Sequence, residues 1–249
     1  MNTNDELSKS TMSLEEHLEE LRRRLIYGLA GLGVCTIFCL IFGSHLVQYL
    51  QQPYRVIEPD KPLTALAPAD AFIGYMKVSL IAGIIVSSPW IFYHLWKFVA
   101  AGLYKKEKHY VLIAVPFSTA LFIIGALFFF YVVAPITLRF FLKFGDIVGV
   151  MPAWTFQKYI SFMTILMLVF GLAFQTPAAI LILNLTGLVS ITALKKYRKY
   201  VFLAMFVIAA TATPPDVISQ IMLGLPLYAL YELGILLCYI KSSYKAADK

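Results

Sequence analysis

The stretch SLEEHLEELRRRLIYGLAGLGVCTIFCLIFGSHLVQYL, residues 13–50, decides the fold class. Four glutamates and three arginines lead directly into a run that carries no charged residue from Leu25 to Tyr54. A helix of about 20 apolar residues is long enough to cross the hydrocarbon core of a bilayer. The run is therefore predicted to be a membrane-spanning helix. It follows a polar segment and ends at no small-residue cleavage site, so we expect a retained anchor rather than a cleavable signal peptide.

The composition extends this prediction to the whole chain. Of the 249 residues, 60% are hydrophobic and only 14% are charged. Globular domains average about 45–50% apolar and about 25% charged residues, and a soluble domain of this size cannot bury so much apolar surface. The composition therefore indicates a multi-pass membrane protein in contact with lipid. The net charge of +7 is interpreted as a signal of membrane topology, and no nucleic-acid partner is expected.

Five further apolar runs follow the first one along the chain. They cover residues 71–96, 111–138, 159–194, 200–213 and 217–240. We predict an all-α integral membrane protein with six transmembrane helices, the last two short and forming a hairpin. The hairpin is expected to turn at residues 213–216, because two consecutive prolines there cannot continue a helix.

The distribution of lysine and arginine predicts the orientation. Fifteen of the 21 basic residues fall in the N-terminal segment, the second and fourth connections and the C-terminal tail, and five fall in the other three connections. By the positive-inside rule, both termini are predicted to be cytoplasmic, in a cell inner membrane. The chain is predicted to be a single six-span domain, 1–249, with a cytoplasmic segment 1–24, a transmembrane core 25–240 and a cytoplasmic tail 241–249.

Polar side chains inside the runs are costly in lipid and are candidates for function. Lys77 either extends to the interface or serves a polar site, and Glu232 has no evident sequence-local partner. Gln175 either bonds a facing helix or mends the kink that Pro177 introduces. Thr213 and Gln220 border the proline turn, as a polar edge for a partner or as ordinary interfacial residues.

The N-terminal segment has the pattern of an amphipathic helix. Leucines at 14, 18, 21 and 25 form one apolar stripe, and Ser13 with Glu16 fits a capping box. The spacing predicts ion pairs of Glu19 with Arg23 and of Glu20 with Arg24. The acids therefore either balance the arginines or bind a cationic ligand.

Glu107 is the only acid of the second cytoplasmic connection, residues 98–110. It either forms a surface ion pair or, with Glu20, binds a pair of guanidinium groups, which prefer bidentate carboxylate partners.

The sequence contains no common catalytic motif, so no enzyme activity and no cofactor are predicted. The three cysteines, Cys35, Cys39 and Cys238, lie in apolar runs, and we expect free thiols rather than disulfides. Cys35 and Cys39 share a helical face, but no nearby ligand completes a metal site.

Five segments together resemble the TatC family, the multispanning core subunits of the twin-arginine protein translocase. They are HLEELRRRL at 17–25, SSPWIFYHLWKFVAAGLYKKEKH at 87–109, FGLAFQTP at 170–177, TPPDVISQ at 213–220 and LPLYALYELG at 225–234. The resemblance covers nearly the whole chain. It implies recognition of the Arg-Arg signal peptides of folded proteins, and recruitment of single-span TatA/TatB-type subunits for export driven by the proton-motive force. It also implies a homo-oligomer within a larger complex.

The resemblance also implies roles for individual residues. By motif match, Glu20 and Glu107 contact the signal arginines, and the other matched residues fall into three groups. The cytoplasmic site is shaped by Arg22, Phe98, Leu103 and Tyr104; the partner helices meet Gln175, Thr213 and Gln220; and Asp216 and Glu232 match recurring acids of the last hairpin. This chain departs from the family at two points. Gln175 stands where many relatives carry a glutamate, so it cannot hold a charge, and Ala101-Gly102 stands where relatives often have a proline.

Two other classes of protein are compatible with parts of the pattern. A small-solute or ion transporter is one, with Lys77, Gln175 and Glu232 along a pathway, although the chain has no clear internal repeat. An intramembrane enzyme is the other, and the missing catalytic motifs disfavour it.

Overall fold

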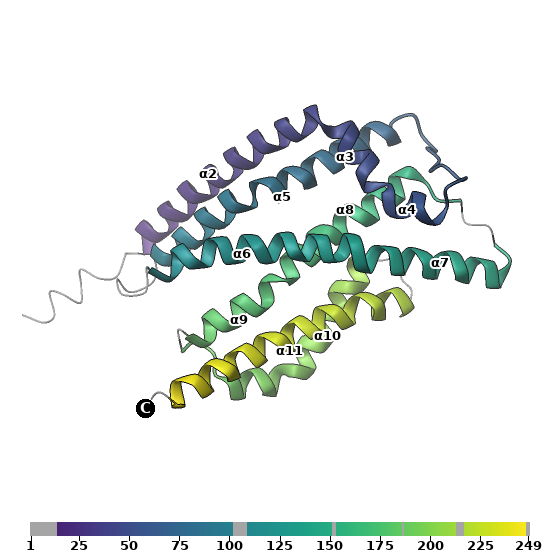
Figure 1. Cartoon of the computed structure of the whole chain (residues 1–249). Coiled ribbons are helices and arrows are strands. Elements are labelled where there is room, and N and C mark those ends of the chain that lie inside the picture. Colours follow the sequence, from purple (N-terminus) through teal and green to yellow (C-terminus); the bar gives the residue numbers. More distant parts are fainter. Residues whose placement is uncertain (1–13, 102–108, 151–152, 186, 213–216, 248–249) are drawn as a thin grey trace, which may run out of the picture. The chain divides into compact units, whose positions relative to one another are not determined.

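The computed structural model describes residues 14–101, 109–150, 153–185, 187–212 and 217–247, and this part of the chain is almost entirely helical (Figure 1). The helices are α2 (Leu14–Ile41), α3 (Gly43–Leu50), α4 (Gln52–Ile57), α5 (Asp70–Ala101), α6 (His109–Phe128), a π-helical turn (Phe129–Val133), α7 (Ala134–Val148), α8 (Phe156–Ala173), α9 (Gln175–Leu185), α10 (Ile191–Ala212) and α11 (Val217–Ala247). Within the described ranges, the sole β-type pairing is an isolated bridge between Thr64 and Thr155.

Five helical stretches are long and apolar enough to cross a membrane. They are Leu18–Ile41, Asp70–Val99, Ala114–Val148, Phe156–Asn184 and Gln220–Lys241. Helix α10 supplies the remaining predicted span, and its first half contains the basic residues 195–199. The predicted all-α, multi-pass membrane architecture is therefore confirmed.

The predicted amphipathic segment and the first span form one continuous helix. Helix α2 begins at Leu14 and passes through the three arginines without a break to Ile41. The rest of the first apolar run is not a continuation of that helix, because it divides into α3 and α4. Pro53, which lacks a backbone N–H, stands at the start of α4, where a helix tolerates it.

The chain divides into two compact units: residues 1–46 with 78–120, and residues 47–77 with 121–249. In the first unit, α2 packs against α5 through small residues. The Trp90 indole covers Gly31, and its Nε1 donates a hydrogen bond of 2.9 Å to the Tyr27 carbonyl. A Cβ at Gly83 would lie 2.8 Å from the Thr36 Cα. Close backbone approach of this kind is typical of membrane helices.

In the second unit, α6 and α8 approach closely at Gly125. A Cβ on this residue would lie 2.6 Å from the Phe170 carbonyl oxygen and 2.8 Å from the Phe174 ring. The rings of Phe129 and Phe170, both fully buried, lie 5.4 Å apart at a tilted angle beside this contact. The missing side chain at Gly125 therefore permits the tight packing of the aromatic core.

Replacing Gly125 by alanine is expected to lower the free energy of unfolding by about 1–2 kcal/mol, because the methyl group forces a backbone to move. Titration with a denaturing detergent, followed by circular dichroism, measures the change. Gly33→Ala is the matched control. Nothing lies within 4 Å of a Cβ at Gly33, so its stability is expected to stay equal or rise slightly. Equal effects at the two glycines would contradict the packing argument.

The fourth run is two helices, and the break falls where proline predicts a kink. Helix α8 ends at Ala173 and α9 begins at Gln175, with Phe174 between them. Pro177 is fully buried and stands in the first turn of α9, so its missing N–H interrupts the hydrogen-bond pattern there.

Helices α10 and α11 form the predicted hairpin and pack along each other (Figure 1). Tyr231 donates a hydrogen bond of 2.7 Å to the Leu194 carbonyl, and the rings of Phe202 and Tyr228 lie 5.2 Å apart. As helices, both are longer than their apolar runs: α10 begins at Ile191 and α11 continues to Ala247. The extra turns are polar, so the predicted short apolar run of α10 is only the second part of a 22-residue helix.

The end of α3 is held by a residue far along the chain. The Tyr159 hydroxyl, on α8, donates a hydrogen bond of 2.8 Å to the Leu50 carbonyl. Leu50 is the last residue of α3, so its carbonyl has no partner within that helix. Tyr159 and Tyr54 are both buried and their rings lie 5.7 Å apart.

Candidate functional site

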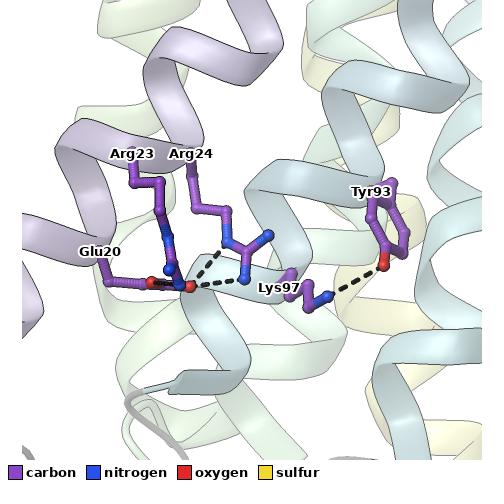
Figure 2. Close-up of polar contacts among 5 residues, drawn as sticks. All are labelled: Glu20, Arg23, Arg24, Tyr93 and Lys97. Atoms are coloured by element: carbon purple, nitrogen blue, oxygen red, sulfur yellow. Dashed lines mark hydrogen bonds and ion pairs between the residues drawn. The ribbon is translucent and has the colours of Figure 1, made fainter.

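The carboxylate of Glu20 is the centre of a charged cluster on the N-terminal part of α2 (Figure 2). The Arg24 guanidinium approaches one carboxylate oxygen with two nitrogens, Nε at 2.7 Å and Nη2 at 2.6 Å from Oε1. Arg23 Nη2 pairs with the other oxygen, Oε2. All three side chains leave the same helical turns, so the spacing of 3 and 4 residues along α2 builds the cluster locally.

Burial differs within this Glu20 cluster. The side chains of Glu20 and Arg24 are only 11% and 13% exposed, whereas that of Arg23 is 59% exposed. Both guanidiniums lie against the Glu20 carboxylate, so the favourable charge of Arg24 and Arg23 offsets the cost of its burial. Glu20 and Arg24 therefore form the shielded part of the cluster, and Arg23 forms its exposed edge.

The ion pairs differ from one of the two predicted pairings. Glu20 with Arg24 is confirmed, but Glu19 with Arg23 is wrong, because Arg23 turns back to Glu20 at a separation of three residues. Either spacing places two side chains on one helical face, so the sequence alone does not choose between them. As a result, both oxygens of one carboxylate are taken by guanidiniums of the same helix.

Two grooves adjoin the Glu20 cluster in the first unit. One, of about 510 Å³, is open and follows α2 along Glu19, Glu20, Arg22, Arg23, Ile26 and Tyr27. The other, of about 190 Å³, is mainly apolar and lies between α2 and α5, and Leu21, Arg24, His94 and Phe98 are part of its wall. A charged contact thus stands beside an apolar one, as a peptide with cationic and apolar residues would require.

Three of the predicted signal-peptide residues therefore share one region. Glu20 and Arg22 line the open groove, and Phe98 lines the apolar groove. Arg22 forms no ion pair with any residue in the described ranges. Leu103, Tyr104 and Glu107 lie outside the described residues, so their predicted contribution stays a prediction.

His94 belongs to the same region and was not predicted from the sequence. It is 6% exposed and packs 4.6 Å from the Trp90 ring and 5.7 Å from the Tyr27 ring. Neither ring nitrogen has a hydrogen-bond partner among the described residues. The sequence feature that could have pointed to His94 is its position one helical turn after Trp90, as a polar residue in an apolar run.

Glu232 has two partners that hold it within the α10–α11 hairpin. Arg198 Nη2 lies 2.6 Å from its Oε2, and the Tyr228 hydroxyl donates a hydrogen bond of 2.7 Å to its Oε1. The expectation that Glu232 lacks a sequence-local partner is wrong, because Tyr228 lies one turn earlier in α11. Arg198 was counted only as a topology signal, and a contact across 34 residues leaves no periodic mark in a sequence.

The remaining predicted polar residues are spread over the second unit. The Lys77 ammonium donates a hydrogen bond of 2.8 Å to the Ser161 hydroxyl, and Gln220 Nε2 donates one of 2.9 Å to the Phe206 carbonyl. Gln175 is half-buried at the start of α9. Thr213 and Asp216 lie outside the described residues. The described residues contain no group of three or more metal-ligating side chains, and the three cysteines are free thiols.

Known proteins resemble this chain over most of its length. The family model for the Sec-independent protein translocase protein TatC matches residues 16–226. The TatC proteins of Desulforapulum autotrophicum and Helicobacter pylori are each 38% identical, covering 94% and 90% of this chain and 87% and 86% of their own lengths. A crystal structure of the twin-arginine translocase receptor TatC superposes with a TM-score of 0.84 at 33% identity, over 91% of this chain and 99% of that one. The chain therefore belongs to the TatC family, as a multi-pass membrane component of the Sec-independent protein translocase.

Proposed function

We propose that this protein is the signal-peptide receptor and core subunit of a twin-arginine translocation system. The observation that carries the proposal is that two guanidiniums of α2 engage the Glu20 carboxylate, Arg24 through two nitrogens on Oε1 and Arg23 on Oε2. A carboxylate that already accepts hydrogen bonds from two guanidiniums of its own helix has the charge and the acceptor atoms to bind the guanidinium of a peptide arginine. Charge-assisted pairs of this kind also distinguish arginine from lysine, whose ammonium is a point charge.

In this proposal, Glu20 and Glu107 bind the two arginines of the signal peptide. Arg22, Phe98, Leu103 and Tyr104 shape the surrounding site, and Phe98 contributes apolar contact from α5. The protein lies in the inner membrane, and both termini and this site are on its cytoplasmic side, where folded cargo is available. The whole chain, 1–249, acts as one six-span domain.

Recruitment of partners is assigned to other surfaces. Single-span TatA/TatB-type subunits are proposed to contact Gln175, Thr213 and Gln220, and the protein is proposed to act as a homo-oligomer within a larger complex. The proton-motive force drives export. Gln175 is half-buried and uncharged, which supports a polar contact with a partner helix rather than a charged one.

A crosslinking experiment tests the recognition step. A signal peptide with Arg-Arg and an otherwise identical peptide with Lys-Lys carry the same photoreactive group and are added to the full chain in lipid nanodiscs. We expect the Arg-Arg peptide to crosslink at least ten times more efficiently, because lysine cannot form a bidentate pair. Equal crosslinking of the two peptides would overturn the proposal.

A further inference from the structure

The Glu20 carboxylate is already occupied by cations of its own chain. Arg24 takes Oε1 and Arg23 takes Oε2, so neither oxygen lacks a guanidinium partner. A fork-to-fork pair with a peptide arginine needs both oxygens of the carboxylate. A ligand arginine at Glu20 therefore conflicts with at least one of the two internal arginines.

We propose that Arg23 and Arg24 act as internal competitors for Glu20, so that a signal peptide binds only by displacing at least one of them. The inference rests on the proposed function, since it concerns the same Arg-Arg peptide. In addition to that function, the inference states that the guanidiniums of Arg23 and Arg24 occupy Glu20 in the way that the arginines of the peptide would. Arg23 and Arg24 thereby set how high the affinity of a peptide must be for it to bind, although they make no lasting contact with the peptide's arginines.

The two arginines differ in how readily they leave. Arg23 is 59% exposed, and ion pairs of exposed side chains are weak because water and lost side-chain freedom offset them. Arg24 is 13% exposed and bonds through two nitrogens, so it is held more strongly. Arg23 is therefore the first to be displaced, and Arg24 accounts for most of the competition.

Competition of this kind affects every ligand of Glu20 by the same factor. When only a fraction of the protein has a free carboxylate, the apparent dissociation constant of any ligand rises by the inverse of that fraction. The ratio between Arg-Arg and Lys-Lys affinities is then set by carboxylate geometry, and the internal arginines set the affinity threshold. Peptides with weakly binding cationic sequences then do not bind, although the ratio of their affinity to that of the Arg-Arg peptide is unchanged.

The test measures peptide affinity with the full chain in nanodiscs, by fluorescence anisotropy at 150 mM salt. The double variant Arg23→Gln/Arg24→Gln is expected to bind both the Arg-Arg and the Lys-Lys peptide roughly tenfold more tightly, with their ratio unchanged. Arg23→Gln alone is expected to tighten both about twofold to threefold. This single variant keeps the experiment decisive if the change at the less exposed Arg24 impairs folding.

Two controls separate competition from a general change of charge. Lys97→Gln removes one positive charge from α5, where Lys97 bonds the Tyr93 hydroxyl and makes no contact with Glu20 (Figure 2). It is expected to change both affinities by less than twofold. Arg23→Lys/Arg24→Lys keeps the charge but removes the forks, and it is expected to bind about threefold more tightly than wild type. Wild-type affinity of the lysine variant would attribute the effect to charge and overturn the inference.

The same arginine substitutions in a chain that also carries Glu20→Gln separate this inference from the proposed function. In that chain, Arg23→Gln/Arg24→Gln is expected to tighten peptide binding only by the amount that the loss of two positive charges causes, because the Glu20 carboxylate is no longer there to compete for. If Glu20→Gln itself leaves Arg-Arg binding unchanged, the proposed function fails. If Glu20→Gln weakens binding but Arg23→Gln/Arg24→Gln does not strengthen it, the proposed function stands and the competition is refuted.

Discussion

A Glu20→Lys variant will bind an Arg-Arg signal peptide at least about 100-fold more weakly than the wild-type protein. The substitution removes the carboxylate that pairs with Arg23 and Arg24, the only one to do so among the described residues, and leaves a third cation beside them. Removing one member of a desolvated charge pair typically costs about 2–5 kcal/mol of binding free energy, and like charges add repulsion. Fluorescence anisotropy with the purified chain in nanodiscs measures the dissociation constant, and export of an Arg-Arg reporter measures the consequence.

Glu15→Lys is the matched control for this charge reversal. Glu15 lies on the same helix and is exposed, and it forms no ion pair within the described ranges. Its reversal is expected to weaken binding less than threefold, through long-range repulsion alone. If both reversals weaken binding to the same degree, the general charge of the segment governs the interaction, and Glu20 has no special role.

The second large effect is expected on stability, at the α10–α11 hairpin. Glu232→Leu leaves the Arg198 guanidinium without its carboxylate, while the Arg198 Nε is already buried with no partner among the described residues. Removing one partner of a fully buried ion pair costs about 3–5 kcal/mol. These side chains are 43% and 33% exposed, so we expect about 2–3 kcal/mol of lost unfolding free energy. Titration with a denaturing detergent measures it.

A compensating variant distinguishes an ion pair from a general defect. Glu232→Leu/Arg198→Leu removes both charges, and its stability is expected to return to within about 1 kcal/mol of wild type. Glu58→Gln serves as the control. The Glu58–Lys61 ion pair is longer, at 3.2 Å, and its lysine is 51% exposed, so the loss is expected to cost less than about 1 kcal/mol. A double variant as unstable as Glu232→Leu would contradict the pairing.

The same pair of variants tests the small-solute or ion transporter. That alternative requires charged Glu232 along a pathway, whereas Glu232 is engaged by Arg198 and Tyr228, and Lys77 by Ser161. Normal export of an Arg-Arg reporter by Glu232→Leu/Arg198→Leu would exclude a pathway that depends on this carboxylate.

Much of the fold is predictable from composition and periodicity. Apolar runs place the helices, because a spanning segment must satisfy its backbone internally and face lipid with apolar side chains. The Pro214-Pro215 turn predicts the hairpin, and Pro177 predicts the break between α8 and α9. Division of the first run into α2, α3 and α4 is not predictable, because the whole run is uncharged and hydropathy does not report local bending.

The candidate sites divide in the same way. Glu20–Arg24 follows from helical spacing and is confirmed. Arg198–Glu232 and Lys77–Ser161 join residues 34 and 84 positions apart, so no local pattern encodes them. The choice of Arg23 between Glu19 and Glu20 depends on side-chain burial, which the two adjacent glutamates do not specify in the sequence.

The hydrogen bond from Tyr159 to the Leu50 carbonyl has a consequence for biogenesis. Its two residues are separated by 109 positions, and the unit that contains both is completed only by residues 121–249. During synthesis from the N-terminus, the end of α3 is therefore made well before Tyr159 and the rest of α8. Until Tyr159 is in place, the Leu50 carbonyl needs another hydrogen-bond donor, such as water, because a buried carbonyl without a partner is costly. Nascent chains stalled before residue 159 therefore lack the hydrogen bond that Tyr159 donates to the end of α3.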